Sequence, residues 1–146
     1  MRLILIVFIM SHWQLYALDK VSTLKIYHHL FSVLTHKEKA LVYVKDKAYI
    51  NVFKGSKKIL LVSSPMKAEV ILITDESMLN EFKDMDLPKK SIFLTTNYRY
   101  LKRCNKIIGA LYWRKGRSQL LFIKKRLEHS NIVLPSAYQK FIIEEL

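Results

Sequence analysis

The sequence predicts one α/β domain with an open, mostly parallel sheet of the Rossmann-like type, helices on both faces and an antiparallel hairpin near the C-terminus. Short apolar strands alternate with short helical stretches, which is the pattern of this fold class. The run at residues 68–74 is apolar almost throughout, as in strands covered on both faces. A length of 146 residues allows one domain of this size, and we place it at residues 18–146.

The first 17 residues have the pattern of a secretory signal peptide. Arg2 gives a basic start, residues 3–10 form an uninterrupted apolar run, and Ala17 is a small residue at the expected cleavage site. The apolar run is too short for a stable membrane span, which needs roughly 20 residues. We therefore expect cleavage after Ala17 and export of residues 18–146 to the periplasm. A buried N-terminal strand is the alternative interpretation.

An amphipathic helix is predicted over residues 20–36, because apolar side chains recur there at helical spacing. These are Leu24, Tyr27, Phe31 and Leu34. Histidines 28, 29 and 36 lie on or beside the helix, but no cysteine or carboxylate nearby completes a set of metal ligands. We expect surface or helix-end histidines and no metal site.

Strands and short helices alternate after this helix. Apolar runs predict strands at residues 40–44, 59–62, 68–74 and 91–95. Helices are expected between them, at residues 48–53, 75–85 and 98–104. Asp75 and Glu76 place acids in the first turn of the second of these helices, where the helix dipole favours them.

The C-terminal part of the chain predicts a hairpin followed by helices. Strands at residues 107–113 and 120–123 flank a turn that contains Gly116. A short helix is expected at residues 124–129. Pro135 and Ser136 introduce a last predicted helix at residues 137–146.

The charge distribution is strongly asymmetric. The chain has 25 Lys and Arg against 12 Asp and Glu, and residues 87–127 contain no acid but twelve basic residues. Such a stretch predicts a positive face that attracts an acidic protein, an anionic membrane surface or nucleic acid. A plain solvated face is an equally weighted alternative. The residues that we assign to partner or anion binding are Arg99, Lys102, Arg103, Arg114, Lys115 and Arg117.

A second candidate site is a crevice at the carboxyl ends of the strands, where open α/β sheets bind small ligands. Polar side chains follow three of the predicted strands, as Ser63-Ser64, Thr74-Asp75 and Thr95-Thr96-Asn97. The residues that we assign to the crevice are Ser63, Ser64, Thr95, Thr96 and Asn97. The favoured interpretation of these residues is helix capping, which Ser, Thr and Asn perform commonly.

The sequence offers little support for catalysis. It contains no nucleophile elbow, no paired zinc-binding histidines and no glycine-rich phosphate loop. We therefore expect no enzyme activity, no catalytic residues and no cofactor. Cys104 is the single cysteine, and it is either buried or able to pair two copies of the chain as a homodimer.

The C-terminal third contains Ile108-Gly109-Ala110-Leu111-Tyr112, then Gly116-Arg117, Phe122-Ile123, Leu127 and Ile132-Val133-Leu134-Pro135. This series resembles the closing section of YfiR-like periplasmic proteins. It implies a small exported α/β protein that regulates an inner-membrane signalling protein, such as a diguanylate cyclase, without catalysing a reaction. Redox control through paired cysteines, which the family implies, does not fit a chain with one cysteine.

Two other functions remain open at this point. A periplasmic small-ligand receptor would use the strand-end crevice. A cytoplasmic nucleic-acid-binding protein would have an uncleaved N-terminus and would bind in a salt-dependent way. Export would make nucleic acid an unlikely partner.

Overall fold

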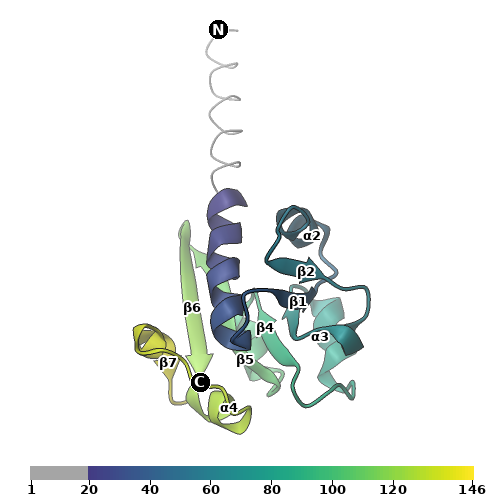
Figure 1. The fold of residues 1–146 in the computed structure, drawn as a ribbon. Helices are drawn as coiled ribbons and strands as arrows, with labels where there is room; N and C mark the ends of the chain where they lie inside the picture. The colour runs from purple at the N-terminus through teal and green to yellow at the C-terminus, as the bar shows by residue number, and fades with distance from the viewer. Residues whose placement is uncertain (1–19) are drawn as a thin grey trace, which may run out of the picture.

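Seven strands form one sheet in the order β2-β1-β3-β4-β5-β6-β7, as seen in a computed structural model that describes residues 20–146 (Figure 1). Neighbours from β2 to β5 run parallel, β5 and β6 are antiparallel, and β7 is parallel to β6. The strands are β1 (Ala40–Tyr43), β2 (Ile59–Leu61), β3 (Val70–Ile73), β4 (Ile92–Thr95), β5 (Ile107–Arg114), β6 (Arg117–Ile123) and β7 (Ile142–Ile143). The predicted α/β class is confirmed.

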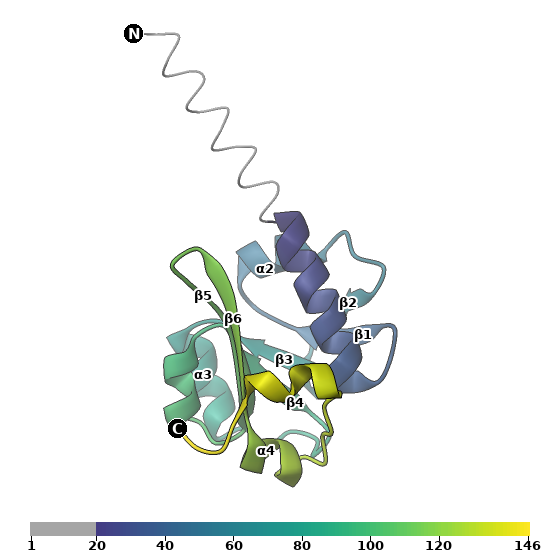
Figure 2. The same ribbon diagram turned by 90° about the vertical axis from the view of Figure 1, so that its left-hand side faces the viewer.

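Helices cover both faces of this sheet (Figure 2). An N-terminal helix occupies residues 20–35. The remaining helices are α2 (Lys47–Phe53), α3 (Glu76–Lys83) and α4 (Lys124–His129), with 3₁₀ turns η1 (Pro65–Lys67), η2 (Tyr98–Lys102) and η3 (Ser136–Phe141).

The central strand β3 separates two hydrophobic cores. All four of its residues are buried, with Val70 and Leu72 in one core and Ile71 and Ile73 in the other. Successive strand side chains point to opposite faces, so a strand covered on both sides must be apolar at every position. This explains the continuous apolar run in the sequence.

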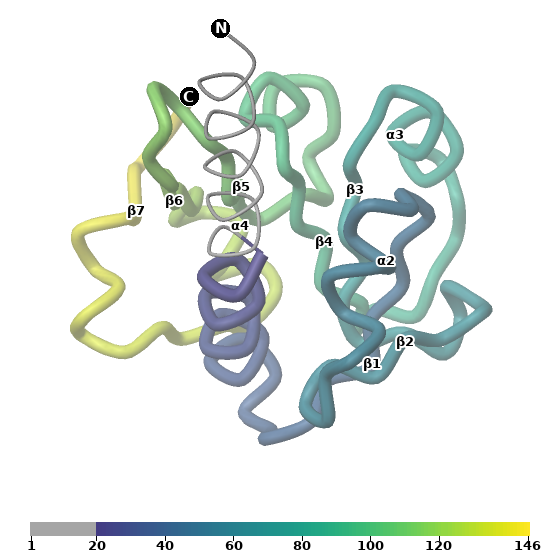
Figure 3. The backbone as a smooth tube through the Cα atoms, turned by 90° about the horizontal axis from the view of Figure 1, so that it is seen from above, coloured from purple at the N-terminus to yellow at the C-terminus, as the bar shows by residue number. Residues whose placement is uncertain are grey.

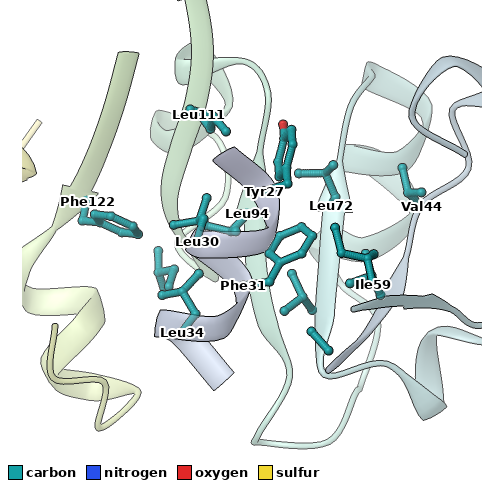
Figure 4. Packing of buried hydrophobic residues seen from close by; sticks show 14 of the residues in the cluster. Tyr27, Leu30, Phe31, Leu34, Val44, Ile59, Leu72, Leu94, Leu111 and Phe122 are labelled. Atoms are coloured by element: carbon teal, nitrogen blue, oxygen red, sulfur yellow. The ribbon is translucent and has the colours of Figure 1, made fainter. Parts of the chain in front are cut away.

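The first core lies under the N-terminal helix. Tyr27, Leu30, Phe31 and Leu34 point from the helix toward the sheet, and each is at most 3% exposed (Figure 4). The ring of Phe53 from α2 meets that of Tyr27 edge-on, with centroids 5.2 Å apart. Helical spacing thus aligns these side chains over the sheet, as the sequence pattern predicts.

The second core lies under α3 and η2. Met78, Leu79 and Phe82 come from α3, and Tyr100 and Leu101 come from η2. The α3 helix begins where the Asp75 carboxylate accepts a hydrogen bond from the Met78 N–H at 2.8 Å. The segment predicted as a helix at residues 98–104 is instead the short 3₁₀ turn η2.

The predicted C-terminal helix is wrong. Residues 136–141 form the 3₁₀ turn η3, and Ile142 and Ile143 then pair with Phe122 and Ile123 as strand β7. The outer edge of β6 carries unpaired backbone groups, and a short strand satisfies them there. The second hairpin strand is also longer than predicted, because pairing continues to Arg114 opposite Arg117.

The predicted signal peptide lies outside the described residues. Among residues 20–146, no helix is long and apolar enough to cross a membrane.

Candidate functional site at the hairpin tip

The β5–β6 hairpin carries three of the predicted site residues at its tip. Pairing runs from Gly109 opposite Phe122 to Arg114 opposite Arg117. Lys115 and Gly116 close the turn with φ angles of 51° and 75°. Two central residues with positive φ are typical of a type I′ turn, which matches the twist of the flanking strands. We call Arg114, Lys115, Gly116 and Arg117 the hairpin tip.

Lys115 occupies a backbone conformation that lysine rarely adopts. In the left-handed region a Cβ lies too close to the following carbonyl oxygen, which costs roughly 1–2 kcal/mol per residue. Asn, Asp and Gly are the usual residues of such turns. The sequence thus keeps a positively charged side chain at position 115 although its backbone conformation is unfavourable for lysine.

The turn η2 lies next to the hairpin. The rings of Tyr98 and Tyr112 are 4.9 Å apart, so the start of η2 packs against β5 just before the tip. Arg99 and Lys102 are exposed on η2. Tyr98 and Trp113 are 44% and 38% exposed, and aromatic rings beside basic groups are common at protein interfaces.

Five of the six predicted basic site residues have no ion-pair partner within residues 20–146. They are Arg99, Lys102, Arg114, Lys115 and Arg117. Arg103 differs, because its guanidinium pairs with the Glu76 carboxylate at the start of α3. That hydrogen bond raises the pKa of Arg103 and lowers the pKa of Glu76. Arg103 is therefore already engaged, whereas the other five cations face solvent.

The acid-free stretch does not form one continuous positive face. Lys124 and Lys125 pair with Glu144 and Glu145. Lys89 and Lys90 precede β4, and Lys106 precedes β5, so these lysines lie at the amino edge of the parallel strands. The hairpin tip follows the carboxyl end of β5 and therefore lies at the opposite edge. Figure 3 shows the molecule from the side of this carboxyl edge. The fold thus divides the twelve cations between two ends of the molecule.

The structure does not bring the five residues of the predicted crevice together. Ser63 and Ser64 follow the edge strand β2, whereas Thr95, Thr96 and Asn97 lie at the end of β4. Strands β1 and β3 stand between them. Three strand spacings place the two groups about 14 Å apart.

Three of the five crevice side chains are used in hydrogen bonds within the fold. Ser64 caps η1 by accepting from the Met66 N–H at 3.3 Å, and Asn97 caps η2 by accepting from the Arg99 N–H at 3.1 Å. The buried Thr95 hydroxyl donates to the Ile73 carbonyl at 2.9 Å. The Ser64 and Asn97 contacts match the capping interpretation, whereas the Thr95 hydroxyl instead bonds the neighbouring strand β3.

The true reversal of strand order lies between β1 and β3, and of the three strand ends named from the sequence only Thr74-Asp75 lies there. Asp46 and Asp75 follow these two strands and cap α2 and α3. The Lys45 ammonium pairs with the Glu81 carboxylate across the same region. Strand order depends on long-range pairing, so no local signal identified this point. The charged groups at this point are thus used in helix capping and in an ion pair.

The remaining candidates from the sequence are Cys104 and a metal site. Cys104 is 2% exposed and packs in the second core, as expected for a small apolar side chain. In the described part of the chain, no group of three or more His, Cys, Asp or Glu side chains has the arrangement of a metal site.

Comparisons with known proteins support the fold alone. No family model matches the chain, and no curated protein matches it significantly. The fold is similar to the crystal structure of a conserved domain protein from Vibrio cholerae O1 biovar El Tor, with a TM-score of 0.57 and 12% sequence identity. The match covers 82% of this chain and 58% of that chain, so this chain spans little more than half of its structural neighbour.

Proposed function

We propose that this protein is an exported, non-enzymatic regulatory module that binds an acidic surface of an inner-membrane signalling protein through the hairpin tip. The observation that carries the proposal is the set of unpaired cations at the tip. Arg114, Lys115 and Arg117 have no carboxylate partner within residues 20–146. Arginine offers bidentate contacts to carboxylates, which suits an acidic partner.

The surroundings of the tip favour a protein partner. Trp113 and Tyr98 remain substantially exposed beside the cations. Protein interfaces are enriched in aromatic residues and arginine, and a few such side chains carry most of the binding energy. The paired strands hold the tip in one position, which lowers the entropy lost on binding.

A charge-reversal experiment tests this proposal. The variant Arg114→Glu, Lys115→Glu, Arg117→Glu is compared with Lys39→Glu, Lys57→Glu, Lys67→Glu, which changes the net charge equally. The control lysines are exposed, and each lies shortly before the start of a parallel strand, at the edge opposite the tip. A crosslinker at Ser118, which is opposite Trp113, reports capture of a membrane protein.

We expect the tip variant to lose crosslinking to the membrane partner and the control variant to keep it. Circular dichroism checks that both variants are folded. Equal crosslinking by the two variants would show that the hairpin tip does not bind the membrane partner. Adhesion of the wild type to protein-free anionic vesicles, lost in the tip variant, would assign the tip to the membrane surface instead.

The proposed location has a direct test. We expect the protein recovered from cells to begin at Leu18 and to be found in the periplasmic fraction. N-terminal sequencing of each cell fraction measures both properties. An intact Met1 in the cytoplasm would contradict export and would favour nucleic acid as the partner of the basic residues, with binding that weakens steeply as salt rises.

A further inference from the structure

An open cavity of about 1180 Å³ lies at the amino edge of the sheet, away from the hairpin tip. The loop between α3 and β4, the start of β5 and the end of α4 surround it. Figure 2 shows α4 at the lower end of the molecule and the hairpin tip at the upper end. A second cavity of about 520 Å³ lies beside it. Residues 88–91 and 130–131 line both cavities.

Two lysines are presented to the cavity by a tight turn. The Ser91 N–H donates to the Pro88 carbonyl at 2.9 Å, which places Lys89 and Lys90 at the central positions. Both lysines line both cavities, and neither has an ion-pair partner in the described part of the chain. The turn therefore holds two adjacent positive charges that no carboxylate of the described residues pairs.

Further positive charge surrounds these lysines. Lysines and arginines at five positions line the larger cavity, against Asp84 and Asp86, and of the five Lys125 is paired with Glu145. The Lys106 ammonium donates to the Met85 carbonyl at 2.7 Å, and Arg126 also donates to backbone carbonyls. Carbonyl oxygens carry no formal charge, so neither cation is neutralised by these bonds. Burial lowers the pKa of Arg126, because removal from water disfavours its charged form.

A hydroxyl group in the wall between the two cavities lacks a partner. The Ser91 hydroxyl oxygen is buried and makes no hydrogen bond within residues 20–146. Leaving a buried polar group unsatisfied costs about 1–3 kcal/mol. Ser91 lines both cavities, so a change of its side-chain rotamer would turn this hydroxyl toward an oxyanion bound there.

We propose that this cavity binds a small ligand through a phosphate group. Lys89 and Lys90 contact the phosphate oxygens, and the Ser91 hydroxyl donates a hydrogen bond to one of them. The charges of Arg126 and Lys106, which line the same cavity, add attraction. Lysine ammonium groups bind phosphate as compact point charges, and a dianion matches two adjacent lysines. The site lies at the opposite edge from the hairpin tip, and this inference does not depend on the proposed function.

Titration of the purified protein with pyrophosphate and with inorganic phosphate at constant ionic strength tests the site. Backbone amide NMR shifts locate binding, and their saturation gives the dissociation constant. We expect the shifts to centre on residues 88–91 and 130–131. Lys89→Ala, Lys90→Ala should raise the dissociation constant for pyrophosphate at least tenfold, and Ser91→Ala should raise it about threefold to tenfold.

The matched control is Lys39→Ala, Lys57→Ala, which removes two exposed lysines outside both cavities. It should bind pyrophosphate as the wild type does. Shifts centred on residues 113–117, or unchanged affinity in Lys89→Ala, Lys90→Ala, would overturn the proposal. Succinate tests the ligand class, because equal binding of this dicarboxylate would contradict phosphate recognition.

Discussion

Gly109 on β5 and Phe122 on β6 face each other across the hairpin at a separation that leaves no room for a side chain on β5. A Cβ built on Gly109 would lie 2.6 Å from Cδ1 of the Phe122 ring and 2.5 Å from the Leu121 carbonyl oxygen. Phe122 is fully buried in the first core. The absence of a side chain at Gly109 therefore lets the Phe122 ring pack directly against the β5 backbone.

Gly109→Ala is expected to destabilise the protein. Either the ring or the β6 backbone must move, and overpacking of this kind costs about 1–3 kcal/mol. Chemical denaturation measures the change in the free energy of unfolding. Gly55→Ala is the matched control, because nothing lies within 4 Å of a Cβ at that position. Equal stability of the two variants would show that the hairpin adapts to a methyl group.

The fold class was predictable because its main evidence is local. The buried strand β3 and the apolar face of the N-terminal helix each leave a periodic signal in a few consecutive residues. Strand β7 leaves none, because Ile142 and Ile143 are too few to show a period. They become a strand only because the edge of β6 lies beside them. Strand β7 therefore depends on pairing with residues twenty positions earlier in the chain, and a local sequence pattern cannot show such pairing.

Arg126 is expected to stabilise the protein through three backbone carbonyls. Its guanidinium donates to the carbonyls of Leu101, Cys104 and Ile107 at 2.7, 3.1 and 2.8 Å. It thus ties α4 to the segment between η2 and β5. Arg126→Met keeps the apolar stem but removes these bonds, and we expect a loss of about 2–3 kcal/mol in the free energy of unfolding.

Arg126→Lys distinguishes geometry from charge. A single ammonium cannot reach all three carbonyls, so this variant should recover only part of the loss. Lys124→Met, which removes an exposed ion pair with Glu144, should leave stability nearly unchanged. Full recovery in Arg126→Lys would show that charge, rather than the fork of the guanidinium, holds this segment.

Lys115→Asn is expected to stabilise the hairpin by about 1 kcal/mol, because asparagine tolerates the left-handed backbone that lysine disfavours. Thermal denaturation measures the gain as a higher melting temperature. Lys115→Ala separates the causes, because alanine removes the charge but is no better suited to a φ of 51°. An equal gain in both variants would assign the effect to charge repulsion with Arg114 and Arg117.

The candidate site was only partly predictable. The sequence identified the turn around Gly116 and its basic residues, because glycine between two apolar strands is a local signal. It did not show that Lys89 and Lys90 lie at the other end of the molecule from that turn. Strand direction decides this, since residues before β4 and residues after β5 lie at opposite edges of a parallel sheet. The count of basic residues along the chain therefore treated the hairpin tip and the Lys89–Lys90 turn as one positive region, although they are separate in the structure.

The contact between His28 and Ser56 requires an uncharged imidazole. The Ser56 hydroxyl oxygen already accepts hydrogen bonds from the N–H groups of Lys58 and Ile59, at 3.0 Å each. Its own proton is therefore the one shared with His28 Nε2, and that nitrogen must act as the acceptor. Burial lowers the pKa of His28, and the nearby Lys58 charge lowers it further.

Stability is therefore expected to fall in mild acid. The unfolded chain binds a proton at His28 near pH 6.5, whereas the folded protein binds it only at lower pH. The contribution of His28 is fully present above pH 6.5 and is lost as pH falls toward the folded-state pKa. We expect the melting temperature to drop between pH 7.5 and pH 5.5 in the wild type and to drop less in His28→Gln, whose amide oxygen still accepts from Ser56. His129→Gln, at an exposed position, should retain the wild-type drop. An identical pH dependence in wild type and His28→Gln would show that the Ser56 contact does not select the neutral imidazole.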